Sequence, residues 1–88
     1  MIRYRLEPDF REKMFRRAVQ EEGSETYVGR LLGYSINYGF RARQLRRGEI
    51  ALSKEQLMTL SGITGISMEE ILHHVVQEVD RKRRGTRP

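Results

Sequence analysis

Residues that favour helix starts alternate with glycines along this chain at short intervals, and this spacing restricts the fold to a series of short helices. A serine, aspartate or asparagine side chain can accept a hydrogen bond from a backbone N–H of the first helical turn. A glycine readily adopts the left-handed conformation in which many helices end. The capping candidates are Asp9, Ser24, Asn37, Ser53 and Ser67, and the terminating glycines are Gly23, Gly33, Gly48, Gly62 and Gly65.

This pattern predicts five helices, with apolar residues recurring at helical spacing inside them. In the fifth, Ser67 and Glu70 have the spacing of a capping box, and an apolar stripe continues through Val75, Val76 and Val79. The predicted helices span residues 9–22, 25–33, 36–47, 54–62 and 68–83.

A short extended arm is expected before the first helix. Within residues 1–7, Ile2, Tyr4 and Leu6 alternate with arginine, which is the pattern of a strand with one apolar face. We therefore expect a single all-α domain over residues 1–88, with the extended arm at 1–7 and a basic, flexible tail at 81–88.

The composition narrows the possible functions. The chain has 88 residues and no cysteine, so disulfides, thiolate metal sites and cysteine nucleophiles are excluded. His73 and His74 are adjacent and point in different directions on a helix, which makes them a poor metal pair. Because no phosphate loop, nucleophile motif or metal-ligand spacing is present either, we expect no enzyme activity, cofactor or metal. No apolar segment is long enough to cross a membrane, so a cytoplasmic protein is expected.

Positive charge favours a polyanionic partner. The formal net charge is +5, and the segment 41–47 holds four arginines and no acidic residue. A second basic cluster lies at 81–87. Any one of these arginines could simply face solvent, but the cluster as a whole indicates contacts with nucleic acid.

The order of signals around this cluster predicts a helix-turn-helix. Ser24 opens a helix that carries Gly29 in its middle and ends at Gly33, and the arginine-rich helix follows. A small residue such as Gly29 lets two helices approach closely, and the second helix can then lie in a major groove. Arginine can pair with guanine or phosphate, and Gln44 can read adenine.

This order resembles the lambda-repressor-like, or Xre-type, family of helix-turn-helix regulators. The similar segments are SETYVGRLLG at 24–33, RRGEIALS at 46–53 and EQLMTLSGITGISMEEIL at 55–72, which together cover rather more than half of the chain. The last segment is the most specific. The resemblance implies a five-helix lambda-repressor-like domain that binds double-stranded DNA.

One departure from the family concerns the third helix. About three residues more than usual separate Gly33 from Gly48, around Tyr34 to Tyr38. Either the turn is longer or the recognition helix starts earlier, because Asn37 can cap the helix but Ser35 or Ile36 could begin it instead.

The expected function is a sequence-specific regulator of transcription, acting as a dimeric repressor with helix 36–47 in the major groove. Alternatives are a protein-interaction module of adaptor or antitoxin-like type, or RNA binding through the basic surface. Fold alone does not decide among them. The candidate DNA-binding residues are Asn37, Tyr38, Arg41, Arg43, Gln44, Arg46 and Arg47.

Helical spacing divides the third helix into two faces. Tyr38, Ala42 and Leu45 share the face expected to be buried, and Arg43, Gln44 and Arg47 lie on the opposite face. Phe40 falls on that opposite face as well. A modest rotation of the helix would bury it, which we expect, although an exposed Phe40 could contact a thymine methyl.

A homodimer is expected because one helix-turn-helix unit contacts too few base pairs for useful specificity. Two segments extend beyond the family core and could meet a second copy: the arm at 1–7 and the end of the fifth helix. We favour the helix, through its stripe of Val75, Val76 and Val79.

Overall fold

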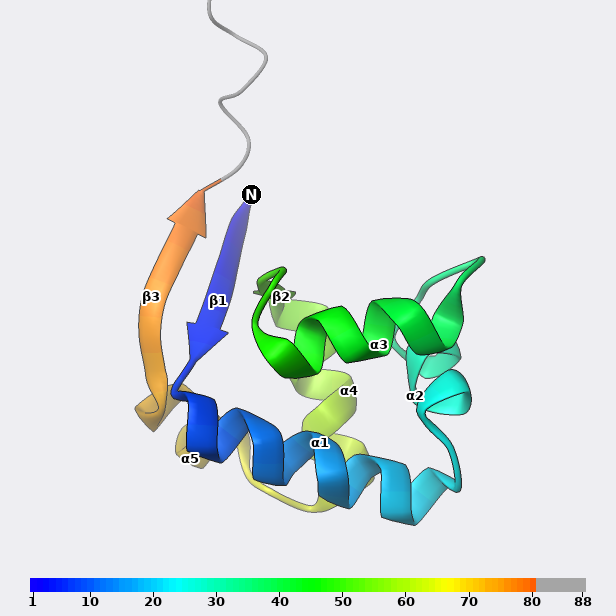
Figure 1. Cartoon of the computed structure of the whole chain (residues 1–88). Helices are drawn as coiled ribbons and strands as arrows, with labels where there is room; N and C mark the ends of the chain where they lie inside the picture. Colours follow the sequence, from blue (N-terminus) through cyan, green and yellow to red (C-terminus); the bar gives the residue numbers. More distant parts are fainter. Residues whose placement is uncertain (81–88) are drawn as a thin grey trace, which may run out of the picture.

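The computed structural model describes residues 1–80 and contains both helices and strands, so the all-α prediction is wrong. Five helices and a three-stranded antiparallel sheet make up this part of the chain, an α+β arrangement (Figure 1). The basic tail predicted at 81–88 lies outside the described residues. The elements are β1 (Ile2–Leu6), α1 (Pro8–Glu22), α2 (Glu25–Leu31), α3 (Tyr38–Arg47), β2 (Leu52–Ser53), α4 (Lys54–Thr64), α5 (Met68–His73) and β3 (Val75–Asp80).

The helix starts follow the predicted serine caps. The hydroxyl oxygens of Ser24 and Ser67 each accept a hydrogen bond from the backbone N–H three residues later, at 3.0 and 3.1 Å. Ser53 and Gln56 form a complete capping box at the start of α4. At α1, Pro8 occupies the first helical turn, so Asp9 lies inside that turn instead of capping it.

The fifth helix is much shorter than predicted. It ends at His73, and the stretch Val75–Asp80 is an extended strand that pairs antiparallel with β1. Val75 and Val76 are adjacent β-branched residues, which suit a strand at least as well as a helix. The arm at 1–7 is extended, as the sequence predicted. It provides the backbone partners of β3, and no local sequence pattern reveals this pairing.

The sheet has the order β2-β1-β3, so the amino-terminal strand is central. Arg3 lies opposite Val79 on one side and opposite Ser53 on the other. The β1–β3 pairing changes register between Arg5 and Leu6, which leaves Val76 as an additional residue in β3. β1 and β3 stand together at one side of the helices (Figure 1).

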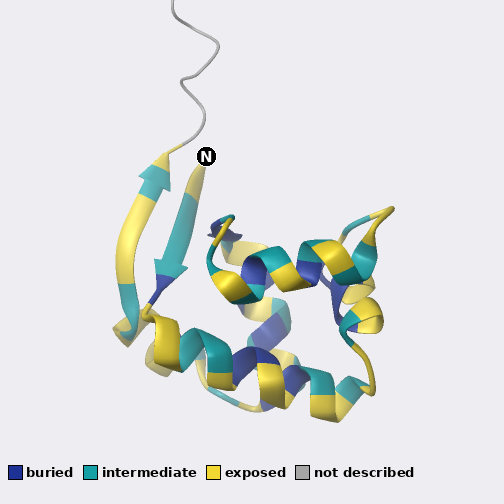
Figure 2. Cartoon of the chain, viewed as in Figure 1, coloured by how far each residue is buried: buried dark blue, intermediate teal, exposed yellow. Residues whose placement is uncertain are grey.

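The core lies between the helices and the inner end of the sheet. Buried segments of α1, α3 and α4 face one another across it, as the dark segments of Figure 2 show. No helix within residues 1–80 is long and apolar enough to span a membrane. The fully buried side chains with the largest volumes are Phe15, Leu6, Met14, Leu45, Leu52, Leu57, Leu60, Ile71 and Val28.

The two adjacent valines of β3 provide a test of its strand conformation. Val75 packs against the core opposite Leu6, whereas Val76 is 61% exposed. We expect Val75→Asp to lower the free energy of unfolding by roughly 2–3 kcal/mol, because a charge would enter an apolar site. Val76→Asp should change it by less than about 0.5 kcal/mol. Urea unfolding followed by circular dichroism measures both, and equal losses would contradict the strand.

Candidate nucleic-acid interface

Two helices, α2 and α3, meet in a contact so close that it has no room for a side chain. A Cβ atom on Gly29 of α2 would lie 2.0 Å from the carbonyl oxygen of Tyr38, at the start of α3. A Cβ on Gly39 would lie 3.0 Å from Thr26 Oγ1. The amino-terminal end of α3 therefore rests directly on α2, as the sequence predicted from Gly29 (Figure 1).

The segment between these helices runs from Leu32 to Asn37, so the turn is longer and α3 starts later than residue 36. Gly33 and Asn37 both have positive φ angles, 98° and 54°. Asn37 precedes α3 without a capping hydrogen bond from its side chain.

A buried glutamine holds this turn in place. Gln56 Nε2 donates to the carbonyl oxygen of Leu32 at 3.3 Å and to the hydroxyl oxygen of Tyr34 at 3.2 Å. The same side chain closes the capping box of α4 through its Oε1 atom. One amide thus ties the turn to the start of α4, using both its donor and its acceptor.

Two arginines fix the other end of α3. Arg11 Nε donates to the carbonyl oxygen of Arg46 at 2.7 Å, and Arg11 Nη2 donates to that of Arg47 at 3.2 Å. Arg5 Nη1 donates to the carbonyl oxygen of Gly48 at 2.6 Å. These bonds satisfy carbonyls that a helix end leaves free, and the positive charges complement the helix dipole.

The two faces of α3 are divided as the sequence predicted, except at Tyr38, which is half-buried, and at Phe40. Ala42 and Leu45 are fully buried, and Arg43 and Arg47 are exposed. Phe40 is 53% exposed, so the expectation that it is buried is wrong. The helix is not rotated toward it, because the contact at Gly29 and the buried Ala42 fix the orientation of α3.

Arg46 lies on the flank of α3 that faces α1 and α2. Its Nε atom is 3.0 Å from Glu25 Oε2, and its Nη1 atom is 3.4 Å from Glu12 Oε1. The hydrogen bond to the Glu25 carboxylate raises the pKa of Arg46 above its ordinary value. Because this guanidinium joins three helices and is only 26% exposed, it acts first as an internal link.

The remaining predicted residues have looser contacts. Arg43 pairs with Glu25 at 3.5 Å and Arg47 pairs with Glu49 at 3.7 Å. The ring of Tyr38 lies 5.7 Å from the Arg30 guanidinium. The pair of Arg47 with Glu49 is exposed and contributes little to stability, so Arg47 can exchange its partner at low cost, whereas Glu25 is half-buried and is shared with Arg46.

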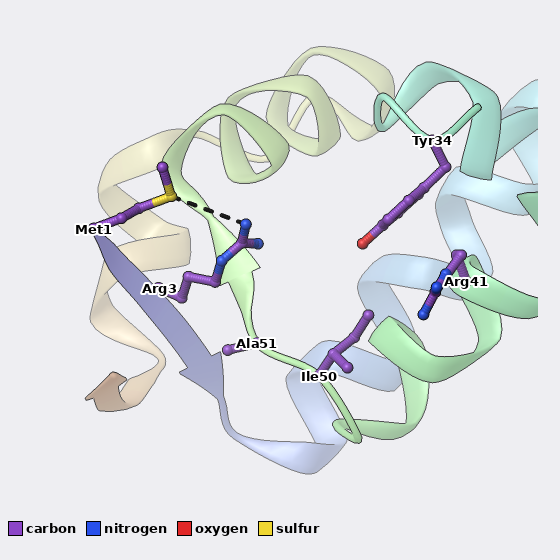
Figure 3. A pocket seen from close by; sticks show the side chains of 6 residues that line it. All are labelled: Met1, Arg3, Tyr34, Arg41, Ile50 and Ala51. Carbon is purple, nitrogen blue, oxygen red and sulfur yellow. Dashed lines mark hydrogen bonds between the residues drawn. The ribbon is translucent and has the colours of Figure 1, made fainter. Parts of the chain in front are cut away.

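Arg41 lies on the flank opposite Arg46 and lines a pocket of about 450 Å³ (Figure 3). Its Nη1 atom donates to Gln44 Oε1 at 3.1 Å. Arg3 of β1 and Tyr34 of the turn line the same pocket. The structure thus brings Arg43, Gln44 and Arg47 to the outer side of α3, and separates Arg41 and Arg46 onto its two flanks.

No protein-family model, curated protein or solved structure matches the chain. Its function must therefore be inferred from the arrangement of its own residues.

Sequence reasoning missed four residues that position α3 or surround it: Arg3, Arg5, Arg11 and Gln56. The capping-box spacing identified Gln56 as a helix-start residue but not its second role at the turn. Arg5 and Arg11 carried no signal, because they bind backbone carbonyls far away in the sequence, and Arg3 was noted only as part of the alternating pattern of the arm.

The close contact at Gly29 gives a test of the α2–α3 arrangement. Gly29→Ala should lower the free energy of unfolding by at least about 2 kcal/mol, because the added methyl would collide with rigid backbone. Gly62→Ala is the matched control, since a Cβ there meets nothing within 4 Å in the interior of α4. This control should gain about 0.5–1 kcal/mol from helix propensity. Urea unfolding compares the two, and a stable Gly29→Ala variant would argue against the contact.

Proposed function

We propose that the chain is a sequence-specific, double-stranded DNA-binding regulator of transcription, and that α2 and α3 form its helix-turn-helix. The observation that carries this proposal is the outer face of α3, which is exposed and basic while both ends of the helix are held by backbone contacts. A ten-residue helix placed in this way can enter a major groove without rearrangement. The resemblance to lambda-repressor-like regulators supports the same reading.

The side chains on that outer face suit the edges of base pairs. Arg43 and Arg47 can each donate two hydrogen bonds to a guanine or to a phosphate, and Gln44 can pair with adenine. Arg43 and Arg47 are themselves exposed, and their ion pairs, at 3.5 and 3.7 Å, and the hydrogen bond between Gln44 and Arg41 are contacts that DNA can replace. Repression is part of the proposal.

Alanine at Arg43, Gln44 and Arg47 together should abolish sequence preference and weaken duplex binding by at least 100-fold. Each base-reading contact contributes roughly 1–3 kcal/mol. The matched control is alanine at Arg16, Arg17 and Gln20 of α1, which removes the same charge and the same residue types from exposed positions. Fluorescence anisotropy with a duplex selected from random sequence measures both.

Duplex affinity unchanged in the α3 variant would contradict the proposal. The same assay with single-stranded and duplex RNA tests the RNA alternative.

A second candidate, binding of a protein partner, has one observation in its favour. Tyr27 and Leu31 lie one turn apart on α2 and are exposed, as are Ile36 in the turn and Phe40 on α3. Exposed apolar groups that lie near one another often mark a protein interface. Failure of the DNA test would make this the leading hypothesis.

We also propose a homodimer, formed through β3 in place of the helical stripe expected from the sequence. Within residues 1–80, β3 pairs with β1 along one edge and with no strand along the other. A second copy can add its own β3 antiparallel across a two-fold axis, which extends the sheet and removes an exposed edge. Pairing centred on Gln77 places Val75 opposite Val79 and keeps Glu78 from facing its copy.

Gln77→Lys should weaken this dimer by about twofold to fivefold, because two lysines would then face each other across the axis. Gln77 is exposed, so the fold of each subunit should remain intact. Gln20→Lys on α1 adds the same charge away from β3 and should leave the dimer unchanged. Sedimentation equilibrium gives the dissociation constants, and a mass near 10.4 kDa at all concentrations would refute the dimer.

A further inference from the structure

The pocket beside α3 is lined by two arginines and by no acidic residue. Close to it, the carboxylate of Asp80 is paired with the amino terminus of Met1 at 3.2 Å. Figure 3 shows Arg3 and Arg41 on different sides of the opening, with the Tyr34 hydroxyl pointing into the space between them. Ile50, Ala51 and Met1 complete the lining, so no carboxylate is among its residues. The volume of about 450 Å³ is in the range of small-ligand sites.

Neither guanidinium in the pocket forms an ion pair within residues 1–80. Arg3 Nη2 donates only to the sulfur of Met1, at 3.9 Å, which is a weak acceptor. Arg41 Nη1 donates to the neutral amide oxygen of Gln44. On the opposite flank of α3, by contrast, Arg46 is paired with two glutamates.

The phenol of Tyr34 adds a neutral donor directed at the same space. Its oxygen accepts a hydrogen bond from Gln56 Nε2, which holds the ring in place and leaves the hydroxyl hydrogen available. Two guanidinium groups and one oriented O–H form a donor set that suits an oxyanion with several acceptor oxygens. A phosphate group fits this description.

We propose that this pocket binds a phosphate group, supplied by the DNA backbone on the Arg41 flank of α3. This step rests on the proposed function, since a helix in the major groove has a phosphate backbone along each side. Within residues 1–80, Arg46 on the other flank is paired with Glu12 and Glu25, whereas Arg3 and Arg41 form no ion pair, so the two flanks are not equivalent. The strand β1 thereby becomes part of the DNA-binding surface, a role that neither its position nor its sequence pattern suggested.

Salt-dependent binding tests the proposal. Arg3→Ala and Arg41→Ala should each weaken binding to every duplex alike, and each should reduce the slope of log affinity against log salt by about one. Both variants should keep the sequence preference of the unmodified protein. The variant with alanine at Arg43, Gln44 and Arg47, by contrast, should lose it. Arg17→Ala on α1 is the single-charge control and should keep the slope. An Arg3→Ala/Arg41→Ala variant with unchanged slope and affinity would overturn the proposal.

A DNA-side measurement keeps the test independent of protein folding. Neutral methylphosphonates can replace the phosphates of the selected duplex one at a time. At one or two adjacent positions the replacement should weaken binding of the unmodified protein. The same replacement should leave binding of the double arginine variant unaffected. If every position weakens both proteins equally, the pocket does not bind a backbone phosphate.

Titration with inorganic phosphate separates this proposal from the proposed function. Phosphate should shift the backbone amide NMR signals of Ile50 and Ala51 in the unmodified protein and leave them in place in the double variant. If the protein binds no duplex but shows these shifts, the proposed function fails and a free phosphorylated compound is the source of the phosphate group. If it shows neither, the phosphate site is refuted as well.

Discussion

The arrangement of α3 depends on one close backbone contact, that between Gly29 and Tyr38. Any side chain at Gly29 would push the amino-terminal end of α3 away from α2. The contact fixes the position at which α3 begins. The additional residues after Gly33 therefore lie in the turn and not in the helix. Gln56 then ties the turn to α4, which connects this contact to the rest of the domain. The exposure of Phe40 follows, because α3 has no freedom to rotate.

The arginines of the chain serve separate purposes that their sequence positions do not distinguish. Arg5 and Arg11 bind carbonyl oxygens at the end of α3, and Arg46 binds carboxylates from two other helices. Arg43 and Arg47 remain on the outer face, where they pair with Glu25 and Glu49 at 3.5 and 3.7 Å. A net charge of +5 is therefore a poor guide to the binding surface by itself, because part of the positive charge stabilises the fold. What matters is which guanidinium groups the fold leaves without a strong internal partner.

Features set by local sequence were predictable, and features set by distant contacts were not. The serine caps, the helix ends at Gly23, Gly48 and Gly65 and the buried face with Ala42 and Leu45 depend on residues within one or two helical turns, and the structure confirms them. Gly62, expected to end the fourth helix, lies inside α4, which continues to Thr64. β3 was predicted as helix because Val75, Val76 and Val79 fit a helical stripe when read alone. Its partner strand lies more than seventy residues earlier in the chain, and only that pairing decides between the two conformations. The inward direction of Arg46 likewise depends on Glu12 and Glu25, outside its own helix.

The outward side chains of α3 could change without loss of the fold. Both ends of α3 are held by backbone atoms: the carbonyl of Tyr38 against Gly29, and the carbonyls that Arg5 and Arg11 bind. Backbone contacts are indifferent to the side chains that α3 presents outward. A residue such as Arg47 can therefore be exchanged at little cost in stability, since its ion pair with Glu49 is exposed. Backbone contacts hold the helix in position, so the side chains on its outer face are free to vary.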